Sequence, residues 1–292
     1  MSDTALGVWY MLIASFLFTL MAVFVKLLPG IPELEIIFFR SIISVVICIW
    51  SLKRIGVALM GKNYTLLIMR GVVGAIALTM NFYLIKSIPL ATASTLFYLA
   101  PICTTLLGIF IVKERVTLVQ FGFFILSFIG VMVVEGFDPR ISLFHLVLGI
   151  INAFMMGLAY NLVRKLSSTE HPLVIIFYFP LVCLPVTGIA CLINWVQPTG
   201  WQWFYLVMVG LTTQVAQYYM TLSYQKAKIS TVSSVNFTGI IYSISLGYIL
   251  FDEHFNLMTY VGMFLVLAGM VLNVYFKDGL SKIRKVKEVA SE

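Results

Sequence analysis

The stretch Leu34–Ser44, LEIIFFRSIIS, has a counterpart later in the chain, Leu173–Cys183, LVIIFYFPLVC. The two stretches lie 139 residues apart, and the same separation joins further pairs of identical residues: Lys26 and Lys165, Gly71 and Gly210, Gly108 and Gly247, Glu114 and Glu253, Gly130 and Gly269. Apolar matches arise by chance in an apolar chain, so the Gly, Lys and Glu pairs count for more. One constant shift without a gap predicts that the chain is an internal duplication.

The composition indicates a membrane protein. Of the 292 residues, 61% are hydrophobic and 11% are charged, and the mean hydropathy is +1.03. A soluble domain is about 45–50% apolar and about a quarter charged. The first apolar run, from about Leu6, is longer than a signal-peptide core and has no basic leader, so we expect an uncleaved first span. A soluble globular domain is therefore excluded.

A membrane-spanning helix needs roughly 20 mostly apolar residues. Ten segments meet this requirement: 6–28, 34–52, 65–85, 90–112, 117–135, 142–163, 172–194, 201–224, 230–251 and 256–276. They predict an all-α membrane protein with ten transmembrane helices. Together with the duplication, they predict a first repeat over 1–138, a second repeat over 139–276 and a basic tail over 277–292.

Lysine and arginine predict the orientation. If the N-terminus is cytoplasmic, fourteen of the 19 basic residues lie in cytoplasmic connections or in the tail, three lie outside, and Arg40 and Arg70 lie within spans. This asymmetry predicts a multi-pass protein of the cytoplasmic (inner) membrane with both termini in the cytoplasm. We expect the tail, with Lys282, Arg284 and Lys285, to bind anionic lipid headgroups rather than nucleic acid.

Each repeat holds five spans, an odd number, so the second repeat enters the membrane inverted relative to the first. Inverted repeats recur in secondary transporters, which bind their substrate near the bilayer midplane where the halves meet. Two similar halves that exchange conformations convert an inward-open cavity into an outward-open one. The chain has no HExxH, no Gly-x-Ser-x-Gly and no carboxylate pair within a span. The duplication therefore favours a secondary transporter over an enzyme, a channel or a membrane scaffold.

Two related segments identify a family resemblance. The segment Pro89–Pro101, PLATASTLFYLAP, is followed by Gly108 and a Lys-Glu-Arg triplet, and residues 229–254 repeat the pattern and end in Asp-Glu-His. With the five-plus-five organisation, the chain resembles the drug/metabolite transporter superfamily, in its EamA-like family, over essentially its whole length. The second half departs from the pattern because Gly239 and Ile240 stand in place of the proline. The resemblance implies a central cavity lined mainly by spans one, three, four, six, eight and nine.

Polar side chains inside spans are costly unless they are paired, so each is a candidate ligand contact. In span eight, two glutamines one turn apart must face protein or water. Tyr98 and Phe237 suit stacking on a flat or cationic ligand, or ordinary core packing. A charge at the cytoplasmic end is the alternative for Arg70, and an interhelical hydrogen bond is the alternative for Asn81. The candidate substrate-binding residues are Arg40, Arg70, Asn81, Tyr98, Asn152, Tyr160, Gln214, Gln217, Tyr218, Asn236 and Phe237.

Arg40 has two interpretations. Six residues at 1.5 Å each place it about 9 Å below the outer end of span two. From there a long side chain reaches headgroups or an outer acid: Glu33, Glu135 or Asp138. Alternatively, Arg40 contacts the ligand in an outer vestibule. Its equivalent in the second repeat is Phe179, so the fold itself does not require a cation at this position.

Three residues are candidates for a hinge or a gate. Pro101 leaves a backbone carbonyl free and bends span four, either as a hinge or as a static kink. Glu114 and Glu253 end their helices on opposite sides of the membrane, where a carboxylate opposes the helix dipole. We therefore expect compensating partners for both, with His254 next to the second, in a structural or gate pair.

These observations predict a secondary transporter that moves a small organic metabolite, an amino acid or an amino-acid or nucleoside-type compound, by alternating access. Phe38–Arg40 and Arg70–Gly71 are similar to a subgroup that includes S-adenosylmethionine carriers, so uptake of that compound, or of a vitamin such as riboflavin, is the alternative. No acid or histidine lies deep in a span, which favours facilitated transport or exchange over proton coupling. No cofactor and no metal are expected, and the protein is either a monomer or a homodimer.

Overall fold

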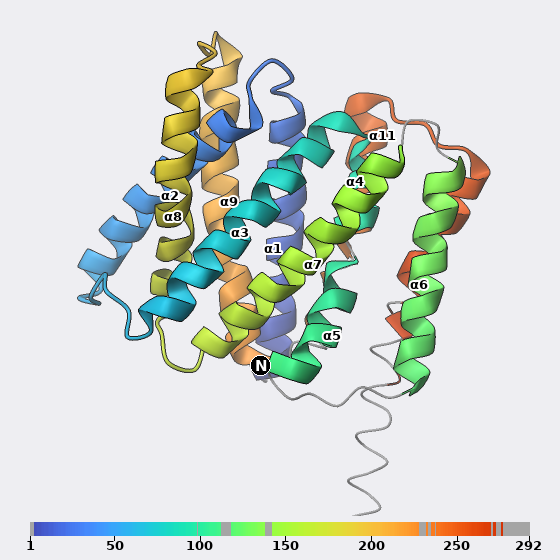
Figure 1. The fold of residues 1–292 in the computed structure, drawn as a ribbon, viewed down its shortest axis with the longest axis horizontal. Coiled ribbons are helices and arrows are strands. Elements are labelled where there is room, and N and C mark those ends of the chain that lie inside the picture. The colour runs from blue at the N-terminus through green and yellow to red at the C-terminus, as the bar shows by residue number, and fades with distance from the viewer. Residues whose placement is uncertain are drawn as a thin grey trace, which may run out of the picture.

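The computed structural model describes residues 3–97, 99–111, 118–137, 142–227, 232, 235–236, 238–269, 271–272 and 276. All regular secondary structure in these residues is helical, and the helices form one bundle (Figure 1). The helices are α1 (Asp3–Lys26), α2 (Glu33–Arg54), α3 (Tyr64–Ser87), α4 (Leu90–Phe97), α5 (Ala100–Ile111), α6 (Leu118–Phe137), α7 (Leu143–Leu166), α8 (Pro172–Ile193), α9 (Trp201–Lys226), α11 (Thr238–Phe251) and a last helix over Leu257–Gly269.

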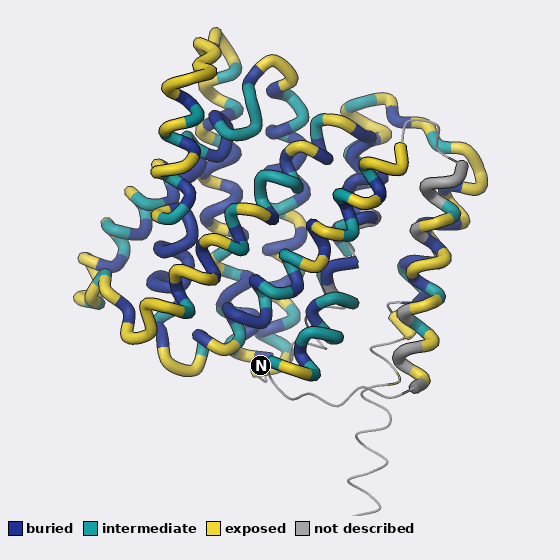
Figure 2. Tube along the Cα trace, in the orientation of Figure 1, coloured by how far each residue is buried: buried dark blue, intermediate teal, exposed yellow. Residues whose placement is uncertain are grey.

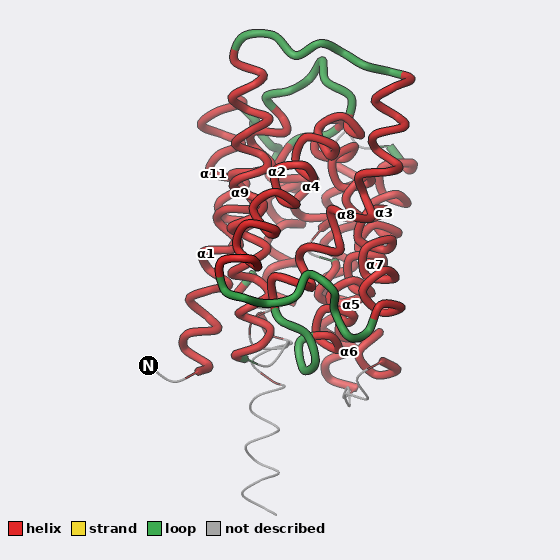
Figure 3. Tube along the Cα trace, turned by 90° about the vertical axis from the view of Figure 1, so that its left-hand side faces the viewer, coloured by secondary structure: helices red, strands yellow, loops and turns green. Residues whose placement is uncertain are grey.

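The helices run between two ends of the bundle where the loops gather (Figure 3). Five of them, α1, α2, α3, α7 and α8, are long and apolar enough to cross a membrane, and shorter apolar helices cover Ile102–Ile111, Ile241–Phe251 and Leu257–Gly269. We call the end at which α1 finishes the Lys26 face, and the opposite end the N-terminal face. The prediction of an all-α, ten-span membrane fold is confirmed.

The predicted span over 90–112 is interrupted. The described part of α4 ends at Phe97, Leu99 lies in a turn and α5 begins at Ala100. Leu99 N donates to Leu96 O and Leu99 O accepts from Cys103 N, both at 3.1 Å. Pro101 is the second residue of α5, where the missing N–H would have had no helical partner. The proline therefore lies just after the break and begins a new helix.

The helix contacts repeat in an inverted order. Helix α1 packs on α9 and, equivalently, α7 packs on α3; α2 packs on α9 and, equivalently, α8 packs on α3. Helices α2 and α8, which are equivalents of each other, pack together. All of these contacts join the first half of the chain to the second, so the core lies between the repeats. Figure 2 shows buried residues on the inward sides of these helices and exposed residues around the periphery.

Two glycines show the inversion at atomic detail. A Cβ at Gly71 would lie 2.6 Å from Val182 Cγ2, and a Cβ at Gly210 would lie 2.6 Å from Ile43 Cδ1. Gly71 and Gly210 are 139 residues apart, and so are Ile43 and Val182. The two contacts are therefore one contact made twice, as an inverted duplication requires.

Helix α6 and the helix over Leu257–Gly269 form a second close pair at the edge of the bundle. A Cβ at Gly130 would lie 2.7 Å from Val266 N, and a Cβ at Gly269 would lie 2.9 Å from Ser127 N. Ser127 Oγ also donates to Val266 O at 3.4 Å. These are again equivalent positions, and small residues at such a crossing let helices approach closely where lipid offers no hydrophobic drive.

The periphery is apolar, as lipid requires. Large hydrophobic side chains are exposed around the outside, among them Trp9, Trp50, Leu192 and Phe264. In water such a surface would be unfavourable, whereas hydrocarbon chains accept it. Many polar side chains in the described spans are buried, and a group of them lines one internal space.

Candidate functional site

A cavity of about 140 Å³ lies at the centre of the bundle, where the two repeats meet. Its wall includes residues from α1, α3, α4, α5, α7, α9 and α11, the spans that the family resemblance implies. It also includes Arg40 from α2 and Phe179 from α8, two helices that are not among the main cavity-lining spans implied by the family resemblance. The central contact between α2 and α8 therefore forms part of the wall.

The cavity straddles the pseudo-twofold axis that relates the repeats. Its wall contains five pairs of equivalent positions, each separated by 139 residues: Met21 and Tyr160, Arg40 and Phe179, Gly74 and Thr213, Leu78 and Gln217, Phe97 and Asn236. Two equivalent residues can line one small space only if the axis passes through it. This is the location that alternating access requires for a binding site.

The paired positions differ in chemistry between the repeats. In the first repeat Arg40 supplies a charge, whereas Met21, Leu78 and Phe97 are apolar and Gly74 has no side chain. Their equivalents in the second repeat, Tyr160, Gln217, Asn236 and Thr213, are neutral and polar, and Phe179 opposite Arg40 is apolar. The fold is symmetric around the cavity, but the ligand-facing chemistry is not.

Two arginines from the first repeat share the ring of Phe179. The Arg40 guanidinium carbon lies 4.8 Å from the ring centroid and the Arg70 guanidinium carbon lies 4.3 Å from it. Both side chains are buried, with 1% and 3% of the residue exposed. A guanidinium over an aromatic face is attracted by the ring quadrupole, so Phe179 holds both cations against one wall.

The two guanidiniums have no anionic partner among the residues that the structure describes. The Nε and Nη1 atoms of both Arg40 and Arg70 are buried without a hydrogen-bond acceptor there. A buried charge without a partner costs several kcal/mol. The cavity is therefore electropositive on the side of α2 and α3 and has unused hydrogen-bond donors.

Gly74 provides the space for this arrangement. It lies one helical turn after Arg70, and a Cβ at this position would clash with Arg70 Nη1 and would lie 2.9 Å from the Phe179 ring. Glycine inside a helix costs roughly 0.5–1 kcal/mol relative to alanine. Here the missing side chain lets the Arg70 guanidinium extend over Gly74, toward the C-terminal end of α3, and approach the Phe179 ring.

The structure brings six of the predicted ligand residues to the cavity wall. They are Arg40, Arg70, Asn81, Tyr160, Gln217 and Asn236. The Asn81 amide nitrogen lies 4.0 Å from Met156 Sδ, and its oxygen has no partner within the described residues. That side chain is thus available to a ligand.

Three further candidates lie elsewhere. Asn152 is buried in α7 without a side-chain partner in the described part of the chain, Gln214 donates to Cys48 Sγ at 3.1 Å, and Tyr218 is 36% exposed. At about 100° per residue, Tyr218 points about 100° away from Gln217. The polar stripe of span eight is wider than the arc that faces the cavity. The candidates Tyr98, Phe237 and Glu114 lie outside the described residues.

Sequence reasoning missed other parts of the wall. The sequence identifies Phe179 only as the equivalent of Arg40, although equivalent residues on helices that cross at the axis are in a position to meet. Ser94 and Ser243, from α4 and α11, are joined by a hydrogen bond of 2.7 Å between their hydroxyls. Thr19 and Thr213 also line the cavity. Their hydroxyls bond to backbone oxygens one turn earlier, at 3.0 and 2.6 Å, which makes such residues inconspicuous in a sequence.

Of the three outer acids expected as partners of Arg40, Glu33 is wrong, whereas Glu135 and Asp138 lie outside the residues whose side chains the structure describes. Glu33 forms an ion pair with Lys86 at 3.0 Å, and Lys86 also donates to Ile31 O at 2.6 Å. Arg40 turns inward because the Phe179 ring and the cavity lie beside it, whereas the Lys26 face lies almost two helical turns away.

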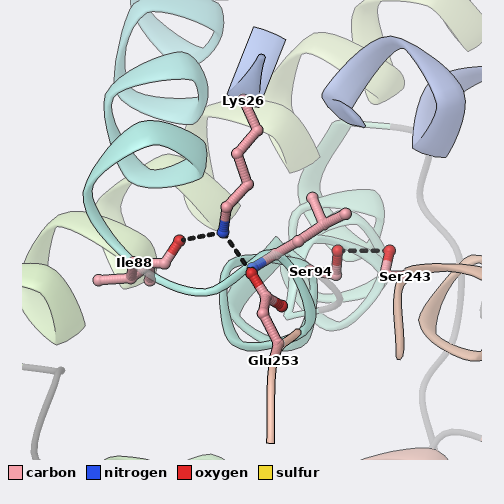
Figure 4. Close-up of polar contacts among 6 residues, drawn as sticks. Lys26, Ile88, Ser94, Ser243 and Glu253 are labelled. Atoms are coloured by element: carbon pink, nitrogen blue, oxygen red, sulfur yellow. Dashed lines mark hydrogen bonds and ion pairs between the residues drawn. The ribbon is translucent and has the colours of Figure 1, made fainter. Parts of the chain in front are cut away.

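The expectation that Glu253 has a compensating partner is met by a residue distant in sequence. Lys26, at the end of α1, forms an ion pair with Glu253 Oε1 and donates to Ile88 O at 3.3 Å (Figure 4). The same carboxylate oxygen accepts from Leu90 N at 2.8 Å. His254, the partner suggested by sequence proximity, lies 2.9 Å from Asp252 Oδ1. The cluster joins α1, the start of α4 and the end of α11 on the side of the cavity nearer the Lys26 face.

Local backbone geometry aims Glu253 at this cluster. Asp252 has a φ of 51°, a left-handed conformation that turns the chain back after α11. Glu253 N then donates to Gly247 O at 3.1 Å. A Cβ at Gly247 would lie 2.5 Å from Glu253 Oε2, so the glycine leaves room for the carboxylate.

Comparisons with known proteins agree with this architecture. The sequence model of the EamA-like transporter family matches residues 5–135 and 143–275. The pseudopaline exporter of Pseudomonas aeruginosa is 28% identical over 279 residues, covering 94% of this chain and 97% of that protein. An uncharacterized transporter of Helicobacter pylori is 27% identical over 91% of this chain and 93% of its own length. Solute carrier family 35 member G1 of Mus musculus is 22% identical over 85% and 72%.

A solved crystal structure shares the fold, with a TM-score of 0.68 at 16% identity over 95% of this chain and 98% of that one. The family description covers both halves of the chain separately, at positions that correspond to the two repeats seen in the helix contacts. The chain belongs to the EamA-like transporter family.

Proposed function

We propose that this protein is a secondary transporter that moves a small organic metabolite, of the amino-acid or nucleoside type, across the cytoplasmic membrane by alternating access. The observation that carries the proposal is the central cavity, lined by five pairs of equivalent positions and by buried polar groups without partners among the described residues. Membership of a transporter family and similarity to a pseudopaline exporter support the same conclusion.

The position of the cavity suggests how access alternates. Because Arg40 and Phe179 are equivalent and touch, their contact lies at the axis and is preserved when the two repeats exchange conformations. Contacts far from the axis must change in that exchange. The Lys26–Glu253 pair is such a contact, and it holds α1, α4 and α11 together on one side of the cavity. Its release is the step that we assign to opening of the Lys26 face.

The positive-inside trend supports a cytoplasmic location for the N-terminal face, where Lys53, Arg54, Lys62, Lys165 and Lys226 lie. The Lys26 face is then periplasmic or extracellular. Similarity to an exporter makes outward movement of the metabolite the first direction to test.

Reconstituted flux is the direct test. The purified protein is placed in proteoliposomes, and uptake of labelled metabolites is measured with and without the unlabelled compound inside. We expect flux that saturates with concentration and is stimulated by the compound on the opposite side. Flux that rises linearly without trans-stimulation identifies a channel, and flux no greater than that of protein-free liposomes removes the transporter assignment.

The same vesicles test the coupling. Since no carboxylate or histidine lines the described cavity, we propose facilitated transport or exchange. An imposed pH gradient is expected to leave the final distribution of the metabolite unchanged. Accumulation against its concentration gradient, driven by the pH difference, would contradict facilitated transport while leaving the transporter assignment intact.

A further inference from the structure

We infer that the ligand of the central cavity is an organic anion, whose acidic group binds between Arg40 and Arg70 and whose neutral part faces the second repeat. This inference rests on the proposed function in one respect, since it takes the cavity to be the transport site. It goes further by assigning the charge of the ligand and its orientation between the repeats.

The first step is geometric. Both guanidinium carbons lie within 5 Å of one ring centroid, at 4.8 and 4.3 Å, and both side chains line the same cavity, so one acidic group in the cavity is in a position to meet both. A cation held over the ring leaves its N–H groups free for other acceptors, and the Nε and Nη1 atoms of both arginines have none among the described residues. The N–H donors project from the edges, which is the direction from which carboxylate or phosphate oxygens are bound in pairs.

The second step is electrostatic. Two buried cations near each other repel, and neither has a carboxylate partner among the described residues. An incoming anion relieves both the repulsion and the missing hydrogen bonds. A cationic ligand would add a third positive charge, and no carboxylate among the described lining residues would balance it. The wall therefore favours net negative charge over neutral compounds, and neutral compounds over cations.

The third step concerns the asymmetry between the repeats. The second repeat supplies the neutral polar groups of Tyr160, Gln217 and Asn236 to the same cavity. Such groups bind hydroxyl, amide or neutral heteroatom functions but do not compensate a full charge. A ligand with its acid toward α2 and α3 and its uncharged polar part toward α7 and α9 satisfies both walls at once.

A charge series of constant length tests the assignment. The probes are succinate, succinamate, succinamide and 1,4-diaminobutane, which share a four-carbon chain but differ in charge, with glycerol phosphate against glycerol for the phosphate form. Binding to the purified protein is measured by the thermal shift and by titration calorimetry at millimolar concentrations. We expect succinate, succinamate and glycerol phosphate to stabilise the protein. Succinamide, glycerol and 1,4-diaminobutane are expected to stabilise it weakly or not at all.

Variants connect the anion to the arginines. Arg40→Gln and Arg70→Gln are each expected to weaken succinate binding by roughly tenfold to a hundredfold, the usual value of a hydrogen bond to a charged group. Arg40→Lys keeps the charge without the planar fork and is expected to bind with intermediate affinity. Arg54→Gln is the matched control, because Arg54 lies on the same helix, 5.3 Å from the Trp50 ring, but is exposed and outside the cavity.

The outcomes separate this inference from the proposed function. Stabilisation by the diamine equal to that by succinate, no stabilisation by any anion, or unchanged anion affinity in both glutamine variants overturns the anion assignment. If saturable flux is then found for neutral or cationic metabolites, the transporter assignment stands alone. If anions bind through Arg40 and Arg70 but no metabolite shows saturable flux, the anion site stands and the transporter assignment fails.

Discussion

Lys26 and Lys165 occupy equivalent positions, each in the last turn of the first helix of its repeat, yet their surroundings differ. Lys26 has 18% of its side chain exposed and is paired with Glu253. Lys165 is exposed at the opposite end of the bundle and has no ion pair within the described residues. The sequence equivalent of Glu253 is Glu114, which lies outside the described residues.

The difference teaches that identical residues at equivalent positions are buried to different extents in the two repeats. Around the axis the equivalents meet one another, as Arg40 and Phe179 do, so a single contact serves both repeats. Away from the axis, the two copies of a contact lie on opposite faces of the membrane and are independent. Lys26 shows the mostly buried, paired form of this position, and Lys165 shows an exposed form that has no ion pair to any residue the structure describes. A transporter that opens one face at a time needs this independence.

The largest expected effect comes from breaking the ion pair between Lys26 and Glu253. In Glu253→Ala, Lys26 Nζ loses its anion and Leu90 N loses its acceptor. Breaking a mostly buried pair typically costs about 3–5 kcal/mol, and we expect about 3 because Lys26 retains some solvent contact. The free energy of unfolding, or the melting temperature in detergent, measures the loss. Lys165→Ala is the matched control and is expected to change stability by less than about 0.5 kcal/mol.

Glu253→Gln refines this result. The amide oxygen is able to accept from Leu90 N but carries no charge, so this variant is expected to lose part of the stability and not all of it. Equal, small losses for Glu253→Ala and Lys165→Ala would show that the Lys26 face is not held by the ion pair.

The next effect concerns the contacts that both repeats share. Gly71→Ala places a methyl group against Val182, and Gly210→Ala places one against Ile43, each 2.6 Å from the nearest side-chain atom. Overpacking at such a site costs typically 1–3 kcal/mol, and the two variants are expected to lose similar amounts. Val182→Ala in the first background and Ile43→Ala in the second are expected to restore part of the loss. Strongly unequal losses, or no rescue, would argue against one contact made twice.

A third effect tests the asymmetry at the cavity. Gly74→Ala pushes against the Arg70 guanidinium and the Phe179 ring, so the affinity for succinate is expected to fall by about tenfold, or 1.4 kcal/mol. At the equivalent position, Thr213→Ala removes a hydroxyl that bonds to Val209 O in its own helix at 2.6 Å, and the affinity is expected to stay near that of the original protein. Calorimetric titration of both variants with succinate measures the two affinities. A greater loss in Thr213→Ala would reverse the roles that we assign to the two walls.

The repeat made most of the fold predictable. The constant shift of 139 residues and the five-plus-five count predicted the inversion, and Gly71 and Gly210 make the contacts that it requires. The break between Phe97 and Ala100 was not predictable at that position, because Pro101 restricts the residue before it but is also tolerated in the first turn of a helix.

The site was predictable only in part. Helical periodicity gives the angle between two residues on one helix, so it grouped Gln214, Gln217 and Tyr218, but it does not say which arc of the helix faces the cavity. Of these three only Gln217 does. Likewise the depth of Arg40 followed from its position in span two, whereas its partner, Phe179, depended on how α2 and α8 cross. Tertiary packing determines both which arc of the helix faces the cavity and which residue contacts Arg40, and periodicity in a single sequence does not predict that packing.

The smallest expected effect concerns the helix caps of the second span in each repeat. Pro32 precedes α2 without a side-chain cap, whereas its equivalent His171 caps α8, with Nδ1 accepting from Leu173 N at 3.3 Å. Burial lowers the pKa of His171 from its ordinary value of 6.5. The unfolded chain therefore binds a proton more readily than the folded one, so this cap contributes its full stability above about pH 6.5 and loses it as the pH falls through the lowered folded-state pKa.

The expected loss is below about 1 kcal/mol, the usual value of one cap. It is measured as the change in melting temperature between neutral and mildly acidic pH, compared with His171→Asn, which caps equally well but does not titrate. The neighbouring Glu170 carboxylate accepts from Lys62 N and Asn63 N in both proteins, so its contribution to stability is the same in each. The difference between the two pH profiles therefore isolates the imidazole. An acid sensitivity as large in His171→Asn as in the original chain would mean that the second repeat, like the first at Pro32, begins this span without help from a titratable cap.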